Sequence, residues 1–205
     1  MHIHLDPVGG IAGDMFAAAM LDYHREWEAP LYEAIRGSGL APDLDVCALR
    51  HNDGCLTGHR FEVTEPTQSA RHQHRHWRQI RELLQNSNLV TPVKQRAIAI
   101  FELLAEAEAA VHGSDIDDVA FHEVGAWDSI ADIIAAAWLI EHSGATSWSC
   151  SPLPLGRGRV FSAHGWLPVP APATAELIKG FPVFDDGFEG ERVTPTGAAI
   201  LKHLD

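Results

Sequence analysis

The densest chemistry in this chain lies between His122 and Asp132, where one imidazole and three carboxylates fall within eleven residues of otherwise apolar sequence. Asp128 and Asp132 are four residues apart, so a helix would place both on one face near its start, where partial positive charge favours anions. Asp128 or Ser129 is a suitable N-cap for that helix. One interpretation is a cap followed by a solvated acidic turn. The other is a site for a cation or a basic substrate, which better explains Asp132 among isoleucines.

A second group of candidate ligands consists of His72, His74 and His76. In an extended segment the three imidazoles share one face, and in a helix His72 and His76 form a pair. Imidazole nitrogen suits nickel, zinc and copper, so one interpretation is a transition-metal site. The other is a solvated basic segment, because these histidines end a polar stretch that we predict to be an exposed loop over residues 65–76.

A glycine-rich turn near the N-terminus contains Gly9, Gly10 and Gly13, with Asp6 before it and Asp14 after it. A strand, a glycine turn and a helix in this order often expose backbone N–H groups to a phosphate. The spacing matches neither the dinucleotide fingerprint nor the P-loop, however. The two aspartates would suit a metal-bridged phosphate better than a bare one. Glycines needed only for a tight turn and close helix packing explain the pattern equally well.

Composition restricts the class of protein and its partners. The formal charge of −13 argues against nucleic acid or an anionic membrane as a partner. Three cysteines without a CxxC pair suggest a reducing compartment. We find no signal peptide and no apolar run long enough to span a bilayer, so we expect a cytoplasmic protein.

Hydrophobic periodicity and turn signals predict the elements that must position these residues. The first predicted helix follows the glycine-rich turn and ends near residue 23. Further helices are predicted at 30–36, 77–85 and 92–111, from 128 or 129 onward, from 170 or 172 to 180, and from a cap at Thr194 to the end of the chain. Predicted strands cover 1–5, 44–49, 59–64, 147–151, 158–161 and 182–184. We therefore predict an α+β fold, with a mixed sheet of short strands flanked by helices, in a single domain over residues 1–205.

Six ordered motifs carry a resemblance that covers essentially the whole chain. They are DPVGGIAGDMF at 6–16, HRHW at 74–77, FHEVGAWDSI at 121–130, CSPLPLG at 150–156, AHG at 163–165 and TPTGA at 194–198. Together they resemble the N-terminal region of the nickel-pincer cofactor nickel-insertion family. Those proteins insert nickel into a pyridinium-3,5-bisthiocarboxylic acid mononucleotide in a CTP-dependent reaction. The product is the cofactor of lactate racemase.

The resemblance also implies what this chain lacks. Family members continue into a C-terminal region of comparable size, which is associated with CTP and metal binding, and this chain stops before it. Nickel is therefore implied for the chain, whereas CTP with magnesium is implied for the full-length family. We expect the lyase-type chelation only together with the C-terminal region. The implied partners are the pincer mononucleotide and that C-terminal region, and a homo-oligomer is a further possibility.

Insertion passes nickel from exchangeable nitrogen or oxygen ligands to two sulfurs and a ring carbon, and the new metal–carbon bond releases a ring proton. A general base is useful for this step, so His122 and Glu123 are the candidate catalytic residues. The candidate metal ligands are Asp6, Asp14, His74, His76, Asp128 and Asp132. The candidate substrate-binding residues are Gly9, Gly10, Gly13, Arg157, His164, Thr194 and Thr196. We further predict that the turn from Asp6 to Asp14 faces the same cleft as His122.

Two other functions remain open. The first is a non-catalytic module that binds the pincer nucleotide or docks a catalytic C-terminal partner. The second is a metal-dependent hydrolase, since His2 and His4 form an HxH pattern on a first strand, as in barrel amidohydrolases. That barrel needs roughly 250 residues and eight βα units, which this chain does not offer.

Overall fold

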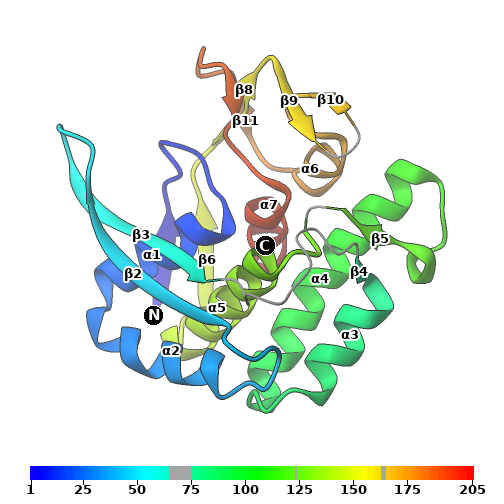
Figure 1. The fold of residues 1–205 in the computed structure, drawn as a ribbon. Coiled ribbons are helices and arrows are strands. Elements are labelled where there is room, and N and C mark those ends of the chain that lie inside the picture. The colour runs from blue at the N-terminus through cyan, green and yellow to red at the C-terminus, as the bar shows by residue number, and fades with distance from the viewer. Residues whose placement is uncertain (65–74, 123, 163–164) are drawn as a thin grey trace.

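The computed structural model describes residues 1–64, 75–122, 124–162 and 165–205 (Figure 1). These residues form seven α-helices, two short 3-10 helices and twelve strands, which confirms the predicted α+β class. Within the described ranges, no helix combines the length and the apolar character needed to cross a bilayer.

The helices follow the predicted periodicity closely. They are α1 (Gly13–Tyr23), α2 (Glu28–Arg36), α3 (Trp77–Asn86), α4 (Thr91–His112), α5 (Trp127–Ser143), α6 (Pro172–Leu177) and α7 (Pro195–Leu204), with 3-10 turns at Arg25–Trp27 and Ile116–Asp118. Thr194 caps α7 as predicted, because its hydroxyl accepts a hydrogen bond from the N–H of Gly197. A proline in the first turn also marks the starts of α4, α6 and α7, so local signals define these helix starts.

Helix α5 forms the centre of the core. From Ile130 to Ile140 every side chain except Asp132 is apolar and buried. Helices α1, α2, α4 and α7 and strand β3 pack around it (Figure 1). Asp132 is therefore a carboxylate in the most apolar helix of the molecule, a position that needs a specific explanation.

The predicted N-cap of α5 is wrong. The helix begins at Trp127, and its N-cap is Ala126, which has extended backbone angles and no capping side chain. Trp127 is buried, so the helix starts early enough to carry that indole into the core. Asp128 lies in the first turn instead, where its Oδ1 accepts a hydrogen bond from the N–H of Ser129 at 2.6 Å.

The strands are short and pair in six two-stranded ladders instead of one continuous sheet. They are β1 (His2–Leu5), β2 (Asp45–Asn52), β3 (Thr57–Thr64), β4 (Arg75–His76), β5 (Ala120–Phe121), β6 (Ser147–Cys150), β7 (Leu153–Pro154), β8 (Gly156–Arg157), β9 (Arg159–Ser162), β10 (Gly165–Pro168), β11 (Val183–Phe184) and β12 (Gly190–Glu191). The ladders β1–β6 and β7–β11 are parallel, and the other four are antiparallel. Both pairing senses occur, as predicted for a mixed sheet, but the ladders do not join into one sheet.

Of the exposed loop predicted over residues 65–76, the structure describes only Arg75 and His76. Residues 65–74 lie outside the described residues. Arg75 and His76 do not belong to a loop, because they form β4, which pairs with β5 (Ala120–Phe121). This pairing brings the end of the histidine-rich segment next to the stretch that leads to His122.

Two distant segments are clamped together beside α5. The N–H of Ile11 donates to the carbonyl of Arg192 at 2.8 Å, and the N–H of Thr194 donates to the carbonyl of Ile11 at 3.1 Å. The approach is close enough to require glycine on both sides. A β-carbon on Gly10, whose φ is +105°, would stand 2.0 Å from the Arg192 carbonyl oxygen, and one on Gly197 would stand 2.3 Å from the Ile11 carbonyl oxygen. The glycine-rich turn is thereby fixed against the start of α7.

Candidate functional site

The N-termini of α1, α5 and α7 border one open cleft of about 420 Å³, which we call the acidic cleft. Its lining residues are Ala12, Asp14, Phe61, Val63, Val124, Asp128, Ser129, Asp132, Glu191, Thr194, Pro195 and Thr196. Five predicted site residues therefore meet in one place: Asp14 of α1, Asp128 and Asp132 of α5, and Thr194 and Thr196 at the start of α7. The helix N-termini contribute partial positive charge, which favours carboxylates at this position.

Asp132 has the most unusual environment in the acidic cleft. Its Oδ1 atom is shielded from solvent and has no hydrogen-bond partner among the described residues, while the backbone N–H of Asp14 donates to its carboxylate. The pKa of Asp132 is raised to about 8, mainly by burial and to a smaller extent by the charges of Asp14 and Asp128. The carboxyl therefore carries a proton at neutral pH, which allows three acidic side chains to lie together.

The α7 side of the cleft presents hydroxyl groups. The Oγ1 atoms of Thr194 and Thr196 are 2.9 Å apart, and Thr196 is buried. Both residues line the acidic cleft, so the structure brings these two predicted substrate-binding residues next to the predicted metal ligands of α1 and α5.

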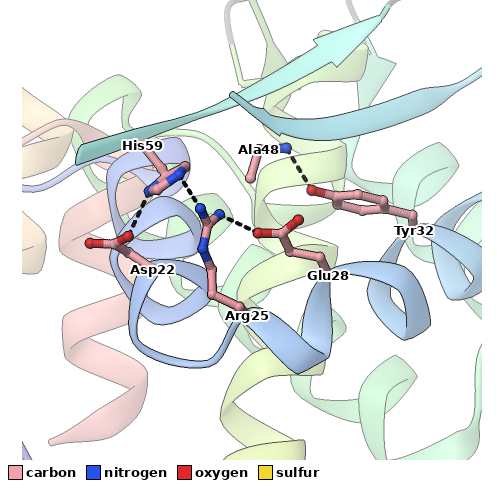
Figure 2. A network of polar contacts seen from close by, with 6 residues as sticks. All are labelled: Asp22, Arg25, Glu28, Tyr32, Ala48 and His59. Atoms are coloured by element: carbon pink, nitrogen blue, oxygen red, sulfur yellow. Dashed lines mark hydrogen bonds and ion pairs between the residues drawn. The ribbon is translucent and has the colours of Figure 1, made fainter. Parts of the chain in front are cut away.

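The hairpin of β2 and β3 supplies the apolar wall through Phe61 and Val63, which sequence reasoning missed. His59 also lies on β3, two residues before Phe61, so both side chains are on the same face of the strand. Its Nδ1 lies 2.6 Å from Oδ1 of Asp22, and its Nε2 contacts the guanidinium of Arg25 (Figure 2). This network fixes the hairpin against α1.

The same network continues into α2. Arg25 also pairs with Glu28, and the Tyr32 hydroxyl accepts a hydrogen bond from the N–H of Ala48 on β2 at 2.6 Å (Figure 2). Both strands of the hairpin are thus attached to the helices beneath them. The apolar wall of the acidic cleft is consequently held by polar contacts outside it.

His122 lies in a neighbouring cavity of about 160 Å³. Val124 and Pro195 line both this cavity and the acidic cleft, so the two spaces adjoin. Asp6 lines a third cavity of about 670 Å³, together with Arg192. The prediction of one cleft shared by His122 and the whole turn is therefore wrong in part: Asp14 lines the acidic cleft, which adjoins the His122 cavity, whereas Asp6 lines a third cavity.

The glycines of the turn differ in their surroundings. Gly10 abuts the Arg192 carbonyl, and Gly13 abuts the Asp132 side chain, so close packing inside the protein accounts for both. A β-carbon on Gly9 would meet no atom within 4 Å.

Arg157 is exposed on β8, where it pairs with Gly190. The residue after that partner is Glu191, which lines the acidic cleft.

His76 has a structural role that the histidine spacing did not indicate. It is the N-cap of α3: its side chain accepts a hydrogen bond from the backbone of Gln79, and its own N–H donates to Oε1 of Gln79 at 3.0 Å.

His74, Glu123 and His164 lie outside the described residues. In the part of the chain that is described, no group of three or more His, Cys, Asp or Glu side chains is arranged to hold a metal ion.

The known proteins that are similar to this chain match it over nearly its whole length. The model of the nickel insertion protein family matches residues 3–205. Curated relatives named for nickel insertion include proteins from Myxococcus xanthus (44% identical over 203 residues), Pelobacter propionicus (46% over 202) and Geobacter metallireducens (45% over 204). Each alignment covers 98% of this chain and 51% of the relative, so the chain spans about half the length of these relatives. No solved structure matches the chain.

Proposed function

The chain belongs to the nickel insertion protein family, and from this premise we propose that it is the nickel-delivering, N-terminal part of a cyclometallase. The proposed reaction places nickel in a pyridinium bisthiocarboxylic acid mononucleotide. The nickel-containing product is the cofactor of lactate racemase. Nickel is the cargo of this reaction and not a resident cofactor.

The observation that carries the proposal is the meeting of Asp14, Asp128 and Asp132 in the acidic cleft. Carboxylate oxygens are harder ligands than the sulfurs of the pincer, so they would hold nickel exchangeably and release it to the softer acceptor. Because Asp132 is protonated at neutral pH, binding of a cation there would release a proton. The lone Oδ1 atom of Asp132 would gain the partner that it lacks.

The ring proton needs a separate acceptor. When the bond between nickel and the ring carbon forms, the carbon–hydrogen bond breaks and its electron pair goes to the metal–carbon bond. We assign the departing proton to the imidazole of His122, whose cavity adjoins the acidic cleft across Val124 and Pro195. Glu123, the neighbouring residue, is the second candidate base.

CTP and magnesium belong to the C-terminal region in this proposal. The glycine-rich turn does not suit a triphosphate, because atoms of the protein itself occupy the space beside Gly10 and Gly13. No step in this chain is therefore assigned to the nucleotide. For the mononucleotide substrate, Thr194 and Thr196 are the proposed contacts at the cleft and Gly9 is a proposed contact on the glycine-rich turn. Arg157 and His164 are proposed for its phosphate.

A second candidate function is a module that binds the pincer nucleotide or docks the C-terminal region without taking part in the chemistry. Two observations favour it: the chain spans half of its relatives, and the described residues contain no ready-made three-ligand metal group. In this case the acidic cleft would be a recognition surface.

An insertion assay distinguishes the two functions. This chain is combined with the C-terminal half of a relative, the pincer nucleotide, nickel, magnesium and CTP, and nickel incorporation is followed by the absorbance of the product. We expect Asp128→Asn, Asp132→Asn and His122→Gln to remain folded and to lose insertion. Asp118→Asn is the matched control, because Asp118 is exposed and outside the cleft. Full activity in all three site variants would leave only the docking function.

A further inference from the structure

The outer face of the β1–β6 ladder carries an alternating row of histidines and serines. His2 and His4 of β1 and Ser149 of β6 are exposed, whereas Ile3 and Leu5 of β1 pack against the core on the other face. The ladder is parallel and pairs His2 with Ser147 and His4 with Ser149. The HxH pattern is therefore a surface feature, displayed by a strand whose opposite face is anchored.

The two imidazoles converge on one hydroxyl. The Oγ atom of Ser149 lies 2.9 Å from Nε2 of His2 and 2.7 Å from Nδ1 of His4. The outer nitrogens contact separate hydroxyls, with Ser147 Oγ 2.9 Å from Nδ1 of His2 and Ser151 Oγ 3.0 Å from Nε2 of His4. One nitrogen of each ring thus points to a common position, and the other is held from outside.

We propose that His2 and His4 form a two-histidine site for a divalent transition-metal ion of the nickel, copper and zinc class, with the ion between Nε2 of His2 and Nδ1 of His4. This site shares no lining residue with the acidic cleft, so the inference does not depend on the proposed function.

The geometry suits a metal at the position that Ser149 Oγ occupies, once the Ser149 side chain has rotated away. Bonds from a metal to imidazole nitrogen are about 2.0–2.1 Å long, so each ring nitrogen has to move inward by less than about 1 Å. The outer N–H groups would then donate to Ser147 and Ser151. Ligating histidines usually have such an oxygen partner at the second ring nitrogen, because it fixes the tautomer and the ring orientation.

The surroundings decide the kind of ion and its lability. Imidazole favours nickel, copper and zinc over magnesium and calcium, which prefer oxygen ligands. The exposed face leaves the remaining coordination positions to water or to an incoming ligand, so the ion would exchange readily. The formal charge of the chain, −13, attracts cations to its surface. An open, two-ligand site is suited to collecting an ion and not to storing it.

The test uses the full chain without an affinity tag, in a background with His72→Gln and His74→Gln that removes competing imidazoles. Calorimetry with nickel or copper chloride measures affinity, and electron paramagnetic resonance of one equivalent of Cu²⁺ counts the coordinated imidazole nitrogens. We expect two nitrogens on the ion. His2→Gln and His4→Gln should each weaken this nitrogen-ligated binding at least about tenfold, and their combination should remove the two-nitrogen copper signal, whatever ions the carboxylates of the acidic cleft still bind. Acidification should weaken it as well, because protonated imidazole cannot ligate.

Two further variants keep the proposal falsifiable. His51→Gln removes a histidine of β2 and should leave the affinity unchanged. Ser149→Ala removes the intervening hydroxyl while keeping both imidazoles, so the affinity should stay equal or increase. Unchanged binding in the double histidine variant, fewer than two nitrogens on the copper, or a tenfold loss in Ser149→Ala would each overturn the two-histidine site.

Discussion

Gly13 lies directly against Asp132: a β-carbon on Gly13 would stand 2.7 Å from the Cβ and 3.0 Å from the Oδ2 of Asp132. Any larger residue at the start of α1 has to displace this carboxylate or separate α1 from α5. The absence of one methyl group therefore determines both the packing of two helices and the position of a cleft residue.

This contact predicts the effect of Gly13→Ala. Alanine is the better helix former, but overpacking at a closely packed contact typically costs about 1–3 kcal/mol, so we expect a lower free energy of unfolding. Urea denaturation measures it. Gly9→Ala is the matched control, because its new methyl group meets no atom within 4 Å, and it should change stability by less than about 0.5 kcal/mol. Equal stability of Gly13→Ala and the wild type would contradict the prediction.

The second prediction concerns pH. Burial and the charges of Asp14 and Asp128 raise the pKa of Asp132 to about 8, so between about pH 4 and pH 8 the folded protein retains a proton that the unfolded chain has released. Stability contributed at this residue therefore falls as pH rises through that window, by up to about 1.4 kcal/mol per pH unit. Below pH 4 both states are protonated, and the effect disappears.

Asp132→Asn removes this dependence. We expect the variant to be more stable than the wild type at pH 8 and to lose most of that advantage at pH 4.5. Urea midpoints of both proteins at several pH values measure the difference in stability, and in this difference the titration of groups distant from Asp132 cancels. Asp118→Asn, an exposed substitution outside the cleft, is the control. A difference between variant and wild type that does not grow with pH would show that Asp132 is ionised in the folded state.

The third prediction concerns the hairpin support in Figure 2. His59→Ala removes the shared partner of Asp22 and Arg25, which are both half exposed and can turn to water, so we expect a loss of about 0.5–1.5 kcal/mol. Hydrogen exchange of the β3 amides should accelerate, because the hairpin is less firmly attached to α1. His51→Ala, on the neighbouring strand, is the control. Unchanged β3 exchange in His59→Ala would show that apolar packing alone holds the hairpin.

The fourth prediction concerns Arg75. Its guanidinium carbon lies 4.3 Å from the centre of the Trp127 ring, and it donates a hydrogen bond to the carbonyl of Gly125. Arg75→Lys keeps the charge but loses the planar stacking group, so we expect a loss of about 1 kcal/mol. Thermal and urea unfolding measure it, with the exposed Arg78→Lys as a control. A fully stable Arg75→Lys would mean that the charge alone anchors the turn before α5.

The helices were predictable from the sequence because their signals are local. Caps such as Thr194 and the apolar periodicity of α4 lie within the elements that they define. The cap of α5 was not predictable in this way, because the burial of Trp127 moved the helix start upstream of Asp128. The two-residue strands β4, β5, β8 and β12 have no periodicity of their own, and only pairing with distant segments creates them.

The site shows the same division. Asp14, Asp128, Asp132 and Thr196 were predicted, and they meet because each follows a helix start that borders the cleft. Phe61, Val63 and Glu191 were missed, because hairpin packing and strand pairing bring them to the cleft, and neither leaves a pattern near those residues. Asp6 shows the limit of proximity in sequence: it flanks the same turn as Asp14 but lines a different cavity.

The clamp between Ile11 and the segment from Arg192 to Thr194 has a consequence for the timing of folding. The two partners are separated by nearly the whole described chain, so the loop that they close carries a large entropic cost and forms slowly. During synthesis on the ribosome, Ile11 remains without these two hydrogen-bond partners until Arg192 and Thr194 have left the exit tunnel. The acidic cleft is consequently among the last features of this region to become complete.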